Sequence, residues 1–265
     1  MNRLPLQAAA LRAEWTKLRT MPGTFWLLAA VVAATVGVSA AAAAATRCPA
    51  RLTCPVDTGK LSLTGVQLGQ AMAAILAVLA IGGEYSSGMI RVTLAAMPCR
   101  VAVLAAKAAV VAGLTLAAGT VAVAGSVLAG ALVLPGHGFT PAHGFPVLSL
   151  ADGPVLRAAA GSVLYLSLIS LLALGVAAAV RDTAVAIGTV LALLYLFPII
   201  AAVAASSQWQ RHLQQLGPTT AGLEIQATRN LHGLPISPWA GLGVLAVWAA
   251  AAVLAGGLQL RFRDA

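Results

Sequence analysis

The chain has 265 residues, of which 60% are hydrophobic and only 9% are charged. Because soluble domains carry charge on about a quarter of their residues, this composition excludes a protein surrounded by water alone. The net charge of +9 comes from Lys and Arg that lie between apolar runs, without a basic stripe interleaved with aromatic residues, which argues against a nucleic-acid partner and is typical of membrane proteins.

The first predicted element is an amphipathic helix over residues 1–20. Apolar side chains recur there at helical spacing, and polar side chains occupy the other directions. The apolar positions are Leu4, Ala8, Leu11, Trp15 and Leu18, and the polar ones are Arg12, Glu14, Thr16, Lys17 and Arg19. Such a helix lies in the membrane interface, where we expect contacts from Leu11, Glu14, Trp15, Lys17 and Leu18. A loose basic tail that only sets orientation is the alternative.

Six long apolar runs follow, and each predicts a membrane-spanning helix. The predicted spans cover about residues 23–45, 62–83, 108–134, 158–180, 183–207 and 238–260. About 20 residues, at about 1.5 Å each, cross a hydrocarbon core of about 30 Å. The runs do not alternate as barrel strands do, so the fold class is all-α. Residues 1–265 are interpreted as one transmembrane domain, with the first run retained rather than cleaved as a signal peptide.

The basic residues predict which way the protein faces. With a cytoplasmic N-terminus, ten of the sixteen Lys and Arg fall on the inner side, which predicts that both termini are cytoplasmic. Cys48 and Cys54 then lie in the first outside loop, where an oxidising compartment allows a disulfide between them. Two unrelated thiols are the alternative.

Residues 84–107 join the second and third predicted spans on the cytoplasmic side. Ser86 or Ser87 can cap a short helix there, and Pro98 would end it. A short helix that projects from the membrane offers a contact for a soluble partner. A plain positively charged connector is an equally good interpretation of the spacing alone.

Polar residues inside the predicted spans are few. No ionisable side chain lies deep in any run, so the membrane body is expected to hold no buried charge that an ion gradient could use. Gln67 and Gln70 lie on one face of the second span, where they either line a substrate path or form hydrogen bonds between helices. Pro198 predicts a kink in the fifth span.

The sequence contains no motif for catalysis. A GxxxxGK[ST] phosphate loop, HExxH, GxSxG and CxxC are all missing, and His137 and His143 have no third ligand nearby. We therefore expect no enzymatic activity, no catalytic residue, no metal site and no cofactor in this chain.

Two segments resemble ABC-2-type transporter permeases, in particular the small bacterial subunits with six spans. The first is residues 11–20, followed by a span, and the second is residues 84–94 together with Pro98, Arg100 and Lys107. The six-span layout extends the resemblance over the whole chain, but the specific motifs cover only these two segments. Met89 departs from the Thr that is usual after the preceding Gly.

The resemblance implies a permease subunit of an ATP-binding cassette transporter in the bacterial plasma membrane. A separate ATPase subunit, which binds ATP and Mg, would press on the N-terminal helix and on the loop between spans two and three. In that loop the coupling residues would be Glu84, Tyr85, Gly88, Arg91, Thr93, Leu94 and Arg100. Two permease chains, identical or different, would form the pathway, with short outside helices around residues 219–225 capping it. Export is the default direction in such families.

Two other classes of function remain open. One is a carrier or channel that works without ATP, which would transport in liposomes that contain this chain alone. The other is a membrane anchor subunit of an envelope or redox complex, for which Gln67 and Gln70 would be dispensable.

Overall fold

The computed structural model describes residues 3–20, 22–48, 54, 56–86, 89, 100–203 and 206–262. The long helices are α1 (Arg3–Thr20), α2 (Pro22–Ala45), α4 (Val66–Ser86), α6 (Arg100–Val133), α7 (Gly153–Val180) and α12 (Pro238–Phe262). Shorter helices are α3 (Thr58–Ser62), α8 (Thr183–Leu191), α9 (Phe197–Val203), α10 (Ser207–Leu216) and α11 (Pro218–Gly222). The described residues form no strand, which confirms the all-α class.

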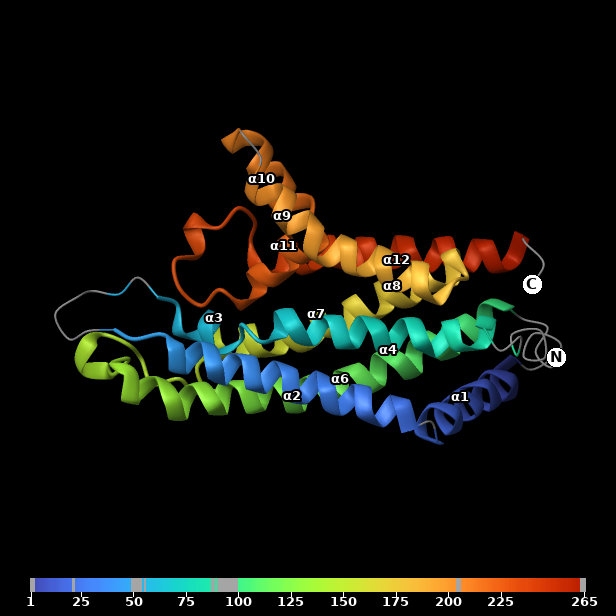
Figure 1. The fold of residues 1–265 in the computed structure, drawn as a ribbon, viewed down its shortest axis with the longest axis horizontal. Helices are drawn as coiled ribbons and strands as arrows, with labels where there is room; N and C mark the ends of the chain where they lie inside the picture. The colour runs from blue at the N-terminus through green and yellow to red at the C-terminus, as the bar shows by residue number, and fades with distance from the viewer. Residues whose placement is uncertain are drawn as a thin grey trace.

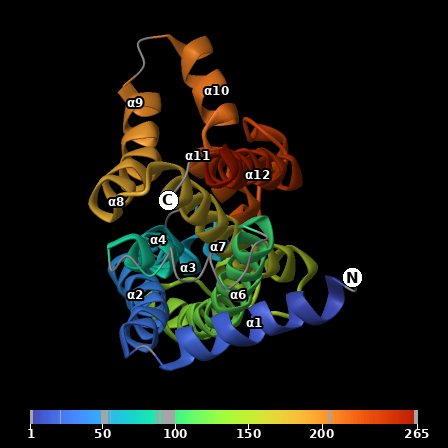
Figure 2. The same ribbon diagram turned by 90° about the vertical axis from the view of Figure 1, so that its right-hand side faces the viewer.

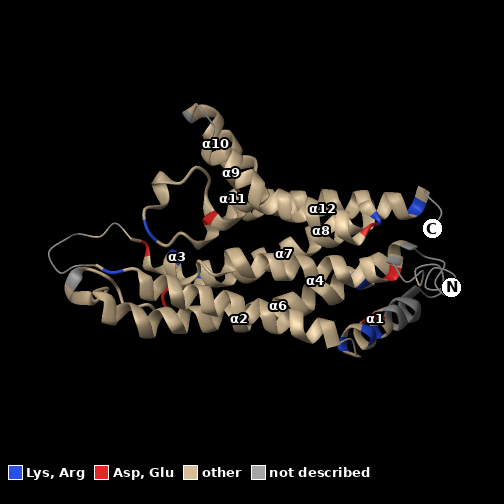
Figure 3. Ribbon diagram, viewed as in Figure 1, with Lys and Arg blue, Asp and Glu red and all other residues tan. Residues whose placement is uncertain are grey.

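Within the described residues, six helices are long and apolar enough to cross a membrane, which confirms the predicted number. They are α2, α4, α6, α7, the stretch Thr183–Val203 and α12. Charged residues lie toward the two ends of these helices, and the middle is almost free of them (Figure 3). The start of α1 and the end of α12 lie at the same end of the molecule (Figure 1).

The helices pack around α7, which contacts α12, α4 and α6. Its buried residues include Tyr165, Leu166, Ile169 and Leu172, and they form the centre of the main hydrophobic core. The long helices run side by side along the molecule, while α1 lies across one end and packs against α6 (Figures 1 and 2). This arrangement places α1 at one end of the molecule and the end of α6 at the other (Figure 1).

Several predicted span boundaries differ from the observed helices. The fourth span begins at Gly153 instead of residue 158. The second span begins at Val66 instead of residue 62, because residues 58–62 form the separate helix α3. The third begins at Arg100 instead of residue 108. The charge of Lys107 set the predicted boundary, but a helix continues through a lysine when neighbouring carboxylates neutralise its ammonium group.

The fifth span changes direction at Pro198. Residues 192–196 form a π-helical segment, η3 (Ala192–Leu196), directly before α9. Proline cannot donate a backbone hydrogen bond inside a helix, and a π-turn is one way in which the chain accommodates this. From there α9 and α10 project away from the bundle (Figures 1 and 2).

Candidate functional site

The residues predicted for coupling are only partly described. Glu84 and Tyr85 lie in the last turn of α4, and Arg100 is the first residue of α6. The other four lie outside the described part of the chain, namely Gly88, Arg91, Thr93 and Leu94. The coupling segment therefore has two described ends, one on α4 and one on α6.

Those two ends meet α1 in a cluster of ion pairs formed by Glu14, Lys17, Glu84 and Lys107, which we call the ion cluster. Nζ of Lys107 donates to Oε2 of Glu14 at 2.6 Å and to Oε1 of Glu84 at 3.1 Å. It also donates to the backbone oxygen of Ala80 at 3.0 Å, and Lys17 pairs with the same oxygen of Glu84. The cluster thus joins α1 to α4 and α6.

Three of the four members of the ion cluster are almost inaccessible. Lys107 is 1% exposed, Glu84 2% and Glu14 4%, whereas the Lys17 side chain is 28% exposed. Charges buried in a low-dielectric interior are stable only when they are paired, and removing one partner leaves another charge uncompensated. The oxygen Oε2 of Glu84 has no hydrogen-bond partner within the described residues. The cluster is therefore a closely paired set of charges in which Oε2 of Glu84 can still accept a hydrogen bond.

This cluster corrects one expectation. No ionisable side chain was expected deep in a span, and that is unaffected, because Glu84 and Lys107 lie just outside the predicted spans 62–83 and 108–134. The sequence also placed Glu14 on the polar side of the first helix, which was wrong, because Glu14 faces α6 and shares the buried side of α1 with Leu18. Glu14 and Leu18 are four residues apart, so they lie on the same helix face, and that spacing was the available signal.

The predicted apolar stripe of α1 is divided between two environments. Leu18 packs into the main core, whereas Leu11 and Trp15 are exposed on the outer surface of the helix. An exposed Trp and Leu beside Lys17 suit the membrane interface, where amphipathic side chains gather. The helix therefore has one side bound to the bundle and another side open to lipid or a partner.

A cavity of about 560 Å³ with mixed polar and apolar walls lies toward the opposite end, between α4, the η3–α9 segment, α10 and the segment after α10. Its walls combine amide, hydroxyl and phenol groups with apolar side chains. The lining residues are Lys60, Gln67, Gln70, Leu194, Tyr195, Pro198, Ile199, Gln214, Thr219, Thr220, Leu223, Glu224 and Pro235. A cavity of this size and mixed polarity is typical of small-molecule sites.

Gln67 and Gln70 both line this cavity, and both take part in contacts between helices. The phenol of Tyr165 on α7 donates to Oε1 of Gln70, and the phenol of Tyr195 donates to the backbone oxygen of Gln67 at 2.6 Å. Gln70 is buried and Gln67 is exposed. The two interpretations that the sequence left open are therefore compatible in this fold.

Short helices cap the bundle beside the cavity, at the place that the resemblance implied. α11 (Pro218–Gly222) continues into the 3-10 turn η4 (Leu223–Gln226), and the side chain of Gln226 donates to the backbone oxygen of Leu63 at 3.4 Å and to Oγ of Ser162 at 3.2 Å. These bonds connect this segment to α7 and to the turn between α3 and α4.

Asp57 fastens the segment before α3 to the turn after η4. Its carboxylate accepts from the backbone N–H of Thr228 at 2.6 Å, from that of Arg229 at 2.9 Å and from that of Lys60 at 3.0 Å, and also from the Thr228 hydroxyl at 2.5 Å. Burial alone would raise the pKa of Asp57, but the bonds from Thr228, Lys60 and Arg229 outweigh it and hold the pKa below its ordinary value.

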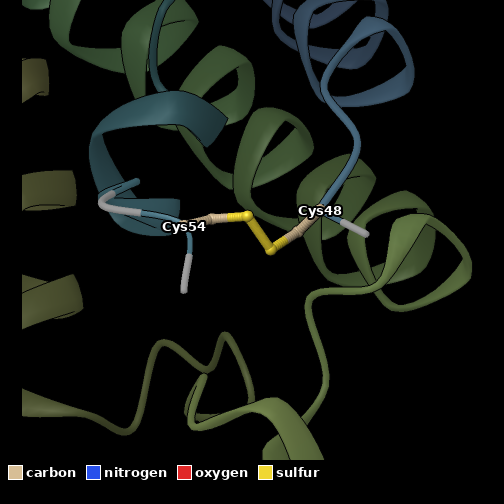
Figure 4. Close-up of a disulfide and its surroundings, with 2 residues drawn as sticks. All are labelled: Cys48 and Cys54. Carbon is tan, nitrogen blue, oxygen red and sulfur yellow. A yellow bond between two sulfur atoms is a disulfide. The ribbon is translucent and has the colours of Figure 1, made fainter. Parts of the chain in front are cut away.

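A disulfide joins Cys48 to Cys54 beyond the end of α2 (Figure 4). The Cα atoms are 6.0 Å apart, which suits such a bond. The backbone N–H of Cys48 also donates to the oxygen of His137 at 3.0 Å, so this loop is held against the end of α6. Nδ1 of His137 lies within hydrogen-bond distance of the backbone oxygen of Val133, at 3.0 Å. The described residues contain no group of three metal-ligating side chains.

No protein-family model matches this chain, and no curated protein matches it. The six apolar helices fit a membrane transport protein.

Proposed function

We propose that this chain is the permease subunit of an ABC-2-type transporter, an exporter that pairs with a second permease chain to form the pathway. A separate ATPase subunit, which binds ATP and Mg, drives it from the cytoplasm. The chain would lie in the bacterial plasma membrane with α1, the end of α12 and residues 87–99 on the cytoplasmic side.

The observation that carries this proposal is the ion cluster. It joins α1, α4 and α6 directly beside the ends of the segment between α4 and α6. A force applied to α1 or to that segment would be transmitted to α4 and α6, because paired buried charges resist separation. Such a junction suits a protein that receives mechanical work from a partner.

The helix α4 connects the junction to the cavity. Glu84 belongs to the ion cluster, and Gln70 and Gln67 on the same helix line the cavity. At about 1.5 Å per residue, Glu84 and Gln70 are about 20 Å apart along the helix axis. A shift of the C-terminal end of α4, which carries Glu84, would therefore move one wall of the cavity.

Co-purification tests the proposal. The chain, solubilised in detergent from a host that also expresses the adjacent genes, should recover a protein with a phosphate-loop ATPase motif. Recovery should be lost in Arg91→Glu while membrane insertion is unchanged, since that residue lies in the proposed contact segment. If the wild-type chain never recovers an ATPase, the proposal is wrong.

A carrier that works without ATP is the second candidate. The buried carboxylate of Glu84 has an oxygen without a hydrogen-bond partner among the described residues, and buried carboxylates in membrane proteins often bind protons or ions. This candidate predicts uptake or release by liposomes that contain the chain alone, with a dependence on an ion gradient. The permease proposal predicts no such transport.

A further inference from the structure

The polar cavity between α4, η3–α9 and α11 has a closed end and an open rim. Gln70, Leu194 and Thr219 are buried at the closed end. Gln67 and Ile199 are exposed, so they mark the rim. A ligand would therefore enter at Ile199 and reach inward to Gln70.

The polar groups of the cavity carry no net charge. Gln70, Thr219 and Tyr195 offer amide, hydroxyl and phenol groups, which both donate and accept hydrogen bonds. Among the described lining residues, only Lys60 and Glu224 are ionised, and their Nζ and Oε2 atoms are 3.4 Å apart. Because these two charges neutralise each other, neither an anionic nor a cationic ligand gains a free counter-ion here.

One polar group at the closed end is unused. The hydroxyl of Thr219 is buried and lines the cavity beside the phenol of Tyr165, but that phenol donates to Gln70, and Thr219 makes no hydrogen bond among the described residues. Buried polar groups in native structures almost always have partners, so an unpaired one at a cavity wall points to a partner from a ligand or from water.

The rim leads onto an apolar surface. Ile199, Ile200 and Val203 on α9 are between 49% and 75% exposed, so an apolar chain can lie along α9 just outside the cavity. The polar end of a ligand would lie near Thr219 and Gln70, and its apolar end would lie on α9. The site therefore suits an amphiphile rather than a wholly polar solute.

We propose that this cavity binds the neutral, hydroxyl-bearing headgroup of an amphiphile, such as an alkyl glycoside, with the alkyl chain along α9. Hydroxyl groups match the amide, phenol and threonine groups because each can donate and accept. Binding needs only this chain. That the bound molecule is the exported cargo rests on the proposed function.

Photolabelling tests the site directly. The wild-type chain in lipid nanodiscs is irradiated with octyl glucoside that carries a diazirine in its alkyl chain, and the labelled peptides are identified by mass spectrometry. We expect label on α9 and on residues 218–224, reduced by unlabelled octyl glucoside. Octyl sulfate and octyltrimethylammonium at the same concentration should not compete. Label spread over all lipid-facing helices, or equal competition by the charged amphiphiles, would overturn the proposal.

Two substitutions locate the headgroup. Thr219→Val removes the unpaired hydroxyl with little change in shape, and we expect binding to weaken about fivefold, the effect of about one hydrogen bond. Ser126→Ala is the matched control, because Ser126 also has a buried hydroxyl without a partner among the described residues but lies on α6 away from the cavity. Equal affinity for Thr219→Val and wild type would count against the proposed headgroup position.

A third substitution tests the role of the charge pair. Glu224→Gln leaves Lys60 without its partner at the cavity, so octyl sulfate should now compete with the photoprobe. If octyl sulfate is still excluded, charge neutrality is not what selects the ligand. Failure of labelling in a chain that does recover an ATPase rejects this site alone, whereas labelling of a chain that recovers none rejects the proposed function alone.

Discussion

Replacing Lys107 by methionine should strongly destabilise the packing of α1 on the bundle. The substitution keeps most of the side-chain length and removes the ammonium group that bonds Glu14, Glu84 and the backbone oxygen of Ala80. Lys17 still pairs with Glu84. Glu14, which is 4% exposed, is then left without a counter-ion within the described residues.

Breaking a buried ion pair by removing one partner costs about 3–5 kcal/mol, because the remaining charge stays desolvated. We therefore expect Lys107→Met to lower the free energy of unfolding by about that amount. Glu14→Gln in the same chain removes the orphaned charge, so the double variant should recover part of the loss. A coupling energy of about 1–3 kcal/mol between the two positions is expected for residues in direct contact.

Unfolding of the purified chain by a denaturing detergent, followed by the loss of helical circular dichroism, measures these differences. Lys60→Met is the matched control. Its pair with Glu224 is longer, and the Lys60 side chain is 44% exposed, so the change should stay below about 1 kcal/mol. If Lys107→Met is as stable as Lys60→Met, the ion cluster does not hold α1 in place.

Three further predictions concern the two ends of the molecule. A membrane-impermeant thiol reagent should label Cys48 and Cys54 only after reduction, and ready labelling without reductant would show that the disulfide is not formed in the native protein. The pKa of Asp57 is lowered by folding, so its bonds contribute stability above about pH 4 that is lost as the pH falls through the folded pKa. In hydrogen exchange, the amide of Thr228 should therefore lose protection in acid, and Asp57→Asn should lower its protection at neutral pH. Arg91→Glu should abolish ATP-dependent export while the chain remains inserted, and normal export would exclude a coupling role for that residue.

The transmembrane helices could be predicted from the sequence because lipid imposes a simple condition. A backbone in hydrocarbon must bond to itself, and a crossing needs a minimum apolar length, so uninterrupted runs such as that ending at Val180 identify the spans directly. The bend at Pro198 could also be predicted, because the missing backbone N–H donor of proline is a local property. Both inferences depend only on neighbours along the chain.

The two sites depend on contacts between residues that are far apart in the sequence, and the sequence alone does not show which residues will meet. Lys107 looked like a loop residue because its charge interrupts an apolar run, and its partner Glu14 is 93 residues away. Gln67 and Gln70 were identified as candidates, but the other cavity walls come from Lys60 and from residues 194–235. Neither partner set could be selected without the packing of α1 on α6 and of α11 on α12.

The most direct test of the central claim is ATP hydrolysis by the ATPase reconstituted in nanodiscs with the wild-type chain and with Glu14→Gln/Lys107→Met. The double variant removes one positive and one negative charge together, so the chain keeps its balance of charge while α1 loses its ion pair with α6. We predict that the wild-type chain changes the hydrolysis rate of the ATPase and that the double variant binds the ATPase without changing its rate. Equal rates with both chains would contradict a coupling role for the ion cluster, and a wild-type chain that binds no ATPase would contradict the whole account.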